Sequence, residues 1–192
     1  MTPGPPDRVL TGLRRVNAGI GLACGLAMLA CCAFILVEIV TRRLAFGLVG
    51  GTDEISGYVM AAIASWAGGY ALVERAHIRV DILHRKLAAP GRALLDIASL
   101  AGLLAVSLAL LFHGWGVVAK SIARGSASNT PLETPLWIPQ SIWLAGWGWF
   151  ALASAILLAL ALAAVARRDW AGVAEIAAPE TDETLGPDEG AR

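Results

Sequence analysis

Charged residues are scarce in this sequence. Only 16% of the 192 residues are Asp, Glu, Lys or Arg, whereas a typical soluble domain carries about 25%. The formal net charge is zero, so the chain lacks the basic surface that nucleic-acid binding requires. Hydrophobic residues make up 57% of the sequence. This balance excludes an ordinary water-soluble domain and indicates a membrane protein.

The polar connections contain no cysteine. Cys24, Cys31 and Cys32 all lie in the first apolar run, where a free thiol behaves as a small hydrophobic group. Disulfide frameworks and zinc sites use spaced cysteines in aqueous segments. Neither kind of site is therefore expected.

Catalytic and cofactor motifs are missing too. The sequence has no nucleophile elbow, no phosphate-binding glycine loop and no HExxH. One histidine, His113, lies in an apolar run, and one histidine cannot supply the paired axial ligands of a membrane b-type haem. The middles of the apolar runs also lack the polar groups with which secondary transporters coordinate substrate and ion. We expect no enzyme activity, no cofactor, and no catalytic, metal or substrate-binding residues.

Four apolar runs are long enough to cross a bilayer, which takes about 20 helical residues. They predict transmembrane helices over residues 16–40, 55–72, 93–118 and 139–166. The first run exceeds the core of a signal peptide, about 7–15 residues, so an uncleaved helix is preferred to a cleaved leader or a lipoprotein anchor. The predicted fold is an all-α membrane protein. Its expected parts are an N-terminal segment (1–15), a four-helix membrane domain (16–168) and an acidic tail expected to be disordered (169–192).

The basic residues predict the orientation of these helices. If the N-terminus is inside, the inner segments hold eleven Lys and Arg residues and the outer segments hold four. Because inner loops of membrane proteins are enriched in basic residues, we expect both termini and both terminal segments to be cytoplasmic.

Several acids lie where helices are expected to begin or end. Thr52 is a predicted N-cap, followed by Asp53 and Glu54 in the first turn, and Asp96 is predicted in the first turn of the third helix. Carboxylates at these positions complement the helix dipole.

Glu38 lies late in the first apolar run, four residues before Arg42. This spacing places the two side chains on one helix face, where they can pair. An ion pair near the membrane surface is preferred to a buried proton relay, because no second intramembrane acid accompanies Glu38.

Small residues recur every four positions in three of the expected helices. Such repeats allow close helix contact in lipid, but they arise easily in an alanine-rich chain. The three sets are Gly57, Ala61, Ser65 and Gly69; Gly19, Ala23, Ala27 and Cys31; and Ala151, Ala155, Ala159 and Ala163.

His77, Asp81 and His84 would share one face if the second connection is helical. A metal site is one interpretation. The preferred one is the polar side of a helix lying at the lipid headgroups, whose apolar side would be formed by Val80, Leu83 and Leu87.

The stretch from the acid pair to the second connection resembles a known family. It combines two acids, a tyrosine four residues after the second, a small-residue helix and a terminal HIRVD block. The sequence resembles the small membrane subunit (DctQ-like) of tripartite ATP-independent periplasmic (TRAP) transporters. The residues that carry the resemblance are Asp53, Glu54, Tyr58, Gly68, Gly69 and His77 to Asp81, with Arg42 or Arg43 and the segment from Thr134 to Pro139.

The resemblance implies a function without catalysis. The chain would be a scaffold in the bacterial inner membrane for a large, elevator-type permease subunit. A periplasmic substrate-binding protein would deliver an organic acid, and an ion gradient would drive its uptake. The large subunit, the binding protein and membrane lipids are therefore the expected partners.

Ten residues form the candidate interface with another subunit or with lipid. We expect one group to order the outer rim and the other to fix the inner connection. The outer group is Arg42, Arg43, Asp53 and Glu54; Tyr58, Gly68 and Gly69 belong to the second helix; the inner group is His77, Arg79 and Asp81.

Two other functions stay open at this level. One is a small redox or metal-binding membrane protein that uses His77, His84 and His113. The other is a membrane-assembly factor that acts without a permease.

Overall fold

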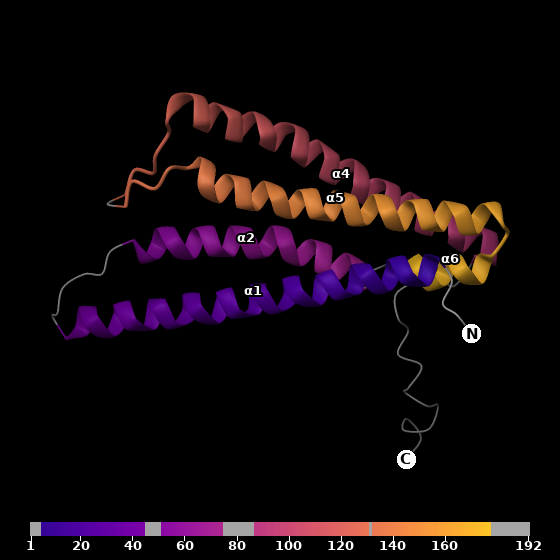
Figure 1. Cartoon of the computed structure of the whole chain (residues 1–192), viewed down its shortest axis with the longest axis horizontal. Helices are drawn as coiled ribbons and strands as arrows, with labels where there is room; N and C mark the ends of the chain where they lie inside the picture. The colour runs from indigo at the N-terminus through magenta and orange to yellow at the C-terminus, as the bar shows by residue number, and fades with distance from the viewer. Residues whose placement is uncertain (1–4, 45–50, 75–86, 131, 178–192) are drawn as a thin grey trace, which may run out of the picture.

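The computed structural model describes residues 5–44, 51–74, 87–130 and 132–177. These residues form four long helices and one short helix. Each long helix runs antiparallel to the long helix before it in the sequence (Figure 1). Each of the four long helices is long and apolar enough to cross a membrane, which confirms the predicted all-α fold with four candidate spans. The helices are α1 (Pro5–Arg43), α2 (Thr52–Val73), α4 (Ala89–Arg124), α5 (Trp137–Ala166) and α6 (Trp170–Ala177).

Helix α5 is the centre of the bundle. It packs against α2 on one side and α4 on the other, while α1 packs along the far side of α2. The short helix α6 folds back under α4 and α5, at the end of the bundle where α1 begins (Figure 1). Both ends of the described chain therefore lie on the same side of the membrane domain.

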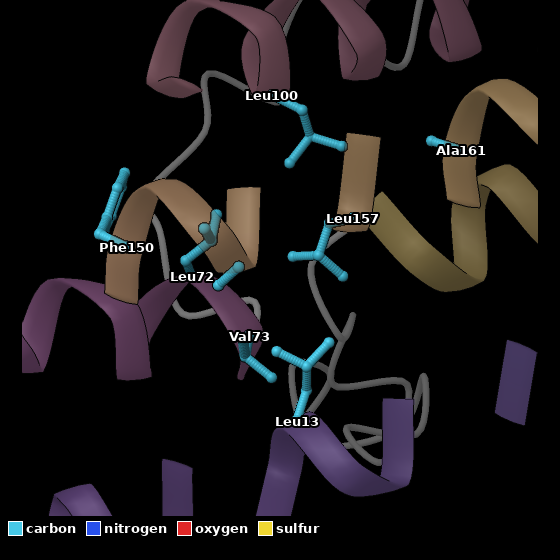
Figure 2. Packing of buried hydrophobic residues seen from close by; sticks show 8 residues of the cluster. Leu13, Leu72, Val73, Leu100, Phe150, Leu157 and Ala161 are labelled. Carbon is cyan, nitrogen blue, oxygen red and sulfur yellow. The ribbon is translucent and has the colours of Figure 1, made fainter. Parts of the chain in front are cut away.

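The hydrophobic core is concentrated in the half of the bundle that lies near α6. There, side chains from α1, α2, α4 and α5 pack around Leu157, which is 3% exposed (Figure 2). Val173 of α6 is fully buried against Ala93 and Ala164. The core cluster comprises Leu13, Leu72, Val73, Leu100, Phe150, Ala153, Leu157 and Ala161.

Two helices begin earlier than the apolar runs. Helix α1 has 39 residues and extends about 58 Å at 1.5 Å per residue, so it includes most of the expected N-terminal segment. Helix α4 begins at Ala89 with Pro90 in its first turn, where the missing N–H of proline costs nothing.

The early start of α4 makes the prediction for Asp96 wrong. The helix is already into its second turn when it reaches Asp96, which is 2% exposed and lies on the buried face with Ala93 and Leu100. The apolar run was a poor guide to the helix start, because α4 continues through the polar residues before that run.

The predicted N-cap at Thr52 is also wrong. Gly51 occupies that position with φ 79° and makes no side-chain hydrogen bond, and Thr52 is the first helical residue. The left-handed backbone favours glycine, and a Cβ at residue 51 would lie 2.6 Å from Cγ of Leu132. Glycine at position 51 therefore lets Leu132, in the loop between α4 and α5, pack closely against the start of α2.

The small-residue repeats differ in their contacts. Ser65 and Gly69 of α2 are buried, whereas a Cβ added to Gly57 would meet no atom within 4 Å. On α5 the buried face passes through Ala153, Leu157 and Ala161; Ala159 and Ala163 of the predicted repeat are exposed. Large and small residues together, rather than an alanine repeat, form the packing face of α5.

Candidate functional site

Glu54 joins the start of α2 to the loop between α4 and α5. The hydroxyl of Tyr58 donates a 2.8 Å hydrogen bond to Oε1 of Glu54, and the hydroxyl of Thr130 donates to Oε2. The hydroxyls of Thr130 and Ser128 lie 2.7 Å apart. One carboxylate thus anchors a tyrosine one turn along its own helix and a loop 76 residues away.

The anchored loop has a compact hairpin shape. The N–H of Ser128 donates to the carbonyl of Thr134 at 2.9 Å, and the N–H of Leu136 donates to the carbonyl of Ser126 at 3.0 Å. Ala127 and Pro135 form an antiparallel bridge. These bonds and Glu54 give this end of the bundle a defined polar surface.

Replacing Glu54 by alanine is expected to free this loop without unfolding the helices. Because Glu54 accepts a hydrogen bond from Thr130 in this loop, hydrogen exchange at the amides of Ser128 and Leu136 should accelerate when the carboxylate is removed. Exchange in the core of α5 should stay unchanged. Asp53→Ala is the matched control, because Asp53 is exposed and precedes the anchor by one residue; equal acceleration in both variants would contradict the anchoring role.

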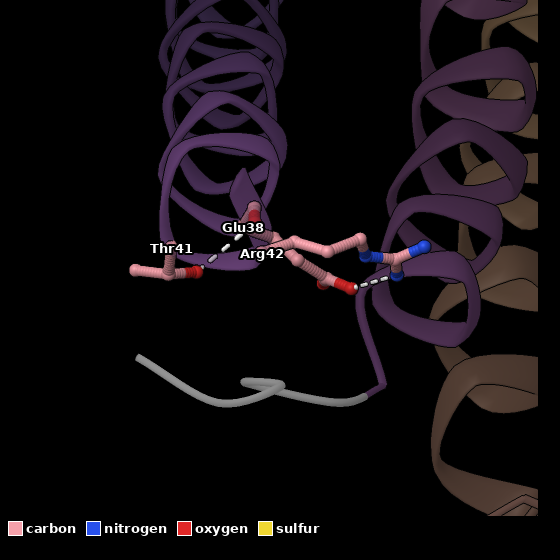
Figure 3. Close-up of polar contacts among 3 residues, drawn as sticks. All are labelled: Glu38, Thr41 and Arg42. Carbon is pink, nitrogen blue, oxygen red and sulfur yellow. Dashed lines mark hydrogen bonds and ion pairs between the residues drawn. The ribbon is translucent and has the colours of Figure 1, made fainter. Parts of the chain in front are cut away.

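The predicted ion pair near the last residues of α1 is confirmed. A nitrogen of Arg42 lies 2.7 Å from Oε1 of Glu38 (Figure 3). The side chain of Glu38 is only 9% exposed, whereas that of Arg42 is 64% exposed. Oε2 of Glu38 is buried with no hydrogen-bond partner among the described residues, so the carboxylate depends on Arg42 for its charge compensation.

Removing Arg42 should therefore cost more than removing both partners. Breaking a fully buried pair costs about 3–5 kcal/mol; because Arg42 is mostly exposed, we expect about 1–2 kcal/mol for Arg42→Leu. The double variant Glu38→Gln with Arg42→Leu should recover most of this loss in thermal unfolding in detergent. Arg43→Leu is the control, since Arg43 is exposed at the same helix end. A double variant as unstable as Arg42→Leu would exclude an uncompensated charge as the cause.

A buried side-chain amide, that of Asn17, connects three helices. Asn17 of α1 is fully buried. Its Nδ2 donates to the carbonyl of Gly69 on α2 at 3.3 Å, and Nε1 of Trp149 on α5 donates to its Oδ1 at 2.9 Å. Asn17 is therefore the polar contact that holds α1 to both neighbours.

A second close contact joins α2 to α5. Nε1 of Trp66 donates to the carbonyl of Ile142 at 3.1 Å. One turn further, a Cβ at Gly146 would lie 2.8 Å from Cβ of Ser65 and 2.9 Å from Cδ1 of Trp66. The two backbones can approach this closely only because residue 146 has no side chain.

The remaining candidate residues fall into three groups. Arg43 at the end of α1 and Asp53 at the start of α2 are exposed. Gly69 lies against Trp149 and Gly68 faces the ring of Phe150, so the pair packs on α5 within this chain. The other candidates, His77, Arg79, Asp81 and His84, lie outside the described residues.

His113 lies on the exposed face of α4, where its ring packs edge-to-face with that of Phe112 at a centroid distance of 5.4 Å. Among the described residues, no three His, Cys, Asp or Glu side chains are grouped closely enough to hold a metal ion. The contacts around His113 do not bring it together with a second ligand in the part of the chain that the structure describes.

The sequence predicted the acid pair but not its partners. Thr130 and Ser128 are ordinary loop residues in the sequence, and nothing there connects them to Glu54. Asn17 was missed for a different reason: it was counted within the first apolar run. A single amide among apolar residues is a signal for a helix–helix hydrogen bond, and that signal would have found it.

The fold defines a multi-pass membrane protein in which a buried amide, Asn17, joins three of the helices. The family model for the DctQ component of tripartite ATP-independent periplasmic transporters matches residues 31–172, from within α1 to within α6. The chain belongs to this family, and the resemblance found in the sequence is confirmed. It is a non-catalytic component of a TRAP transporter and acts with the other subunits of that system. Neither the curated proteins nor the solved structures yield a match to this chain.

Proposed function

We propose that this chain is the scaffold of a TRAP transporter in the bacterial inner membrane. It braces a large, elevator-type permease subunit that takes up an organic acid. A periplasmic binding protein delivers the acid, and an ion gradient drives the uptake. The observation that carries this proposal is the family match over residues 31–172, combined with the four membrane-crossing helices.

The interior of the membrane domain supports a bracing role. The expected spans contain three Asp, Glu, His, Lys or Arg residues, Glu38, Asp96 and His113, and none is near the middle of the bundle. The buried face of α5 consists of apolar side chains, glycine and one serine, Ser154, which bonds to the carbonyl of Phe150 in its own helix. Such an interior favours rigid packing over the coordination of a solute.

The two ends of the bundle support the proposed orientation. The Glu54-anchored hairpin forms a polar surface at the outer end, suited to contact with a soluble periplasmic protein. The opposite end carries Arg14, Arg15, Arg167 and Arg168, consistent with a cytoplasmic position. Reporter fusions at residue 192 and within residues 126–130 should give cytoplasmic and periplasmic signals, respectively; the reverse pattern would contradict this orientation.

Reconstitution tests the scaffold function. The large subunit is placed in liposomes with and without this chain, together with the binding protein and an imposed sodium gradient. The labelled acid is the one that most raises the melting temperature of the binding protein. We expect a stable two-subunit complex, and uptake that depends on this chain. Undiminished assembly and uptake without it would reject the proposal.

A further inference from the structure

The position of His113 indicates a contact with another membrane helix. Of the three residues in the expected spans that are Asp, Glu, His, Lys or Arg, Glu38 and Asp96 are buried inside the bundle. His113 is exposed, on the side of α4 that faces away from α5. Ionisable residues within a membrane span are costly when they face lipid, and they usually face protein or a water-filled cavity.

The depth of His113 makes lipid an unsuitable neighbour. It precedes Lys120 by two helical turns, which is about 10 Å at 1.5 Å per residue. Lysine side chains at a span end extend to the headgroups, and the hydrocarbon core is about 30 Å thick. The imidazole of His113 therefore lies below the headgroups, within the hydrocarbon, where lipid offers no hydrogen-bond acceptor.

The surface around His113 is hollowed. A hollow of about 620 Å³ is lined by Phe112, His113, Trp115, Gly116 and Lys120, among other residues of α4. A Cβ at Gly116 would meet no atom of this chain within 4 Å, so a neighbouring side chain has room to reach the helix backbone. The ionisable side chains in the hollow are a histidine and a lysine, and both donate hydrogen bonds.

We infer that this face of α4 binds a transmembrane helix of the large permease subunit that presents a carboxylate to His113. A carboxylate accepts hydrogen bonds from both donors and complements the charge of Lys120. The inference rests on the proposed function and adds the surface and the chemistry of the contact. Helix α1 is barer, but its polar span residues, Asn17 and Glu38, point inward; its outer face offers only apolar contacts that lipid also satisfies.

Co-purification of the complex through a tag on this chain tests the hydrogen bond. Loss of one such bond between membrane helices is expected to lower the yield of large subunit about fivefold in His113→Leu. His113→Gln keeps a donor and should stay near the wild-type yield. The isolated His113→Leu chain should melt at the wild-type temperature, because the side chain is exposed. An unchanged yield in His113→Leu, or an equal loss in His113→Gln, would overturn the inference.

Photo-crosslinking tests the surface independently. A photoreactive residue is placed at Val117, which lines the hollow and is 52% exposed, or at Leu29 on α1, which is 68% exposed. We expect crosslinks to the large subunit from position 117 and crosslinks to lipid from position 29. Crosslinks to phospholipid alone from position 117 would overturn the inference. If the wild-type chain retains no large subunit, the scaffold proposal fails and the inference fails with it; a wild-type complex with unchanged variants rejects the inference alone.

Discussion

Replacing Gly146 by alanine is expected to destabilise the membrane domain by about 1–3 kcal/mol, the usual cost of overpacking a core. The added methyl group would lie 2.8 Å from Cβ of Ser65 and 2.9 Å from Cδ1 of Trp66. Neither atom can move freely, because the first is bonded to the backbone of α2 and the second belongs to a ring that hydrogen-bonds to Ile142. The helices must therefore separate. Thermal unfolding in detergent measures the loss.

Gly148 provides the matched control for this prediction. It lies two residues further along α5, and a Cβ there would meet only Cδ2 of Leu111, at 3.9 Å. This is an ordinary van der Waals distance, so Gly148→Ala should leave the melting temperature unchanged or slightly raised. If both variants melt alike, the close approach of α2 and α5 at Gly146 does not stabilise the bundle.

Replacing Asn17 by leucine should loosen α1 from the rest of the domain. The variant leaves Nε1 of Trp149 without its partner in a region that water does not reach, whereas the carbonyl of Gly69 keeps its donor within α2. An unsatisfied buried polar group costs about 1–3 kcal/mol. We expect a loss of about this size and faster proteolysis or hydrogen exchange in α1 than in α5.

A double-mutant cycle separates the hydrogen bond from the packing. Trp149→Phe removes the donor to Asn17 and keeps a smaller aromatic ring in place. If the amide bond carries the effect, the double variant should be less destabilised than the sum of the single ones, because each single change already breaks the same bond. Additive losses would assign the effect of Asn17→Leu to packing alone.

The sequence predicts the four long helices well because a bilayer requires long apolar helices with satisfied backbones. It does not predict α6, whose residues Trp170–Ala177 fall in the tail expected to be disordered. It predicts the ends of the long helices poorly. Residues 5–15 and 89–92 are polar enough to resemble loops, yet they continue α1 and α4. Local hydropathy reports where lipid lies, whereas the end of a helix depends on caps and on packing against other elements.

The candidate site shows the same division. Pairs within one helix, such as Glu38 with Arg42, follow from their spacing. Glu54 was also identified, and its bond to Tyr58 is another pair four residues apart. Its bond to Thr130 and the bonds of Asn17 to Gly69 and Trp149 join distant parts of the chain. One sequence contains no signal for such pairs beyond the presence of a polar residue in an apolar run.

The central place of α5 has a consequence for biosynthesis. The ribosome makes this helix after α1, α2 and α4, although each of them depends on it for part of its packing. Asn17 is synthesised 132 residues before Trp149. Until α5 is made, the side chain of Asn17 therefore has only the carbonyl of Gly69 in the α1–α2 hairpin as a partner. The helices inserted early therefore gain their full set of contacts only when the last span arrives and completes the bundle.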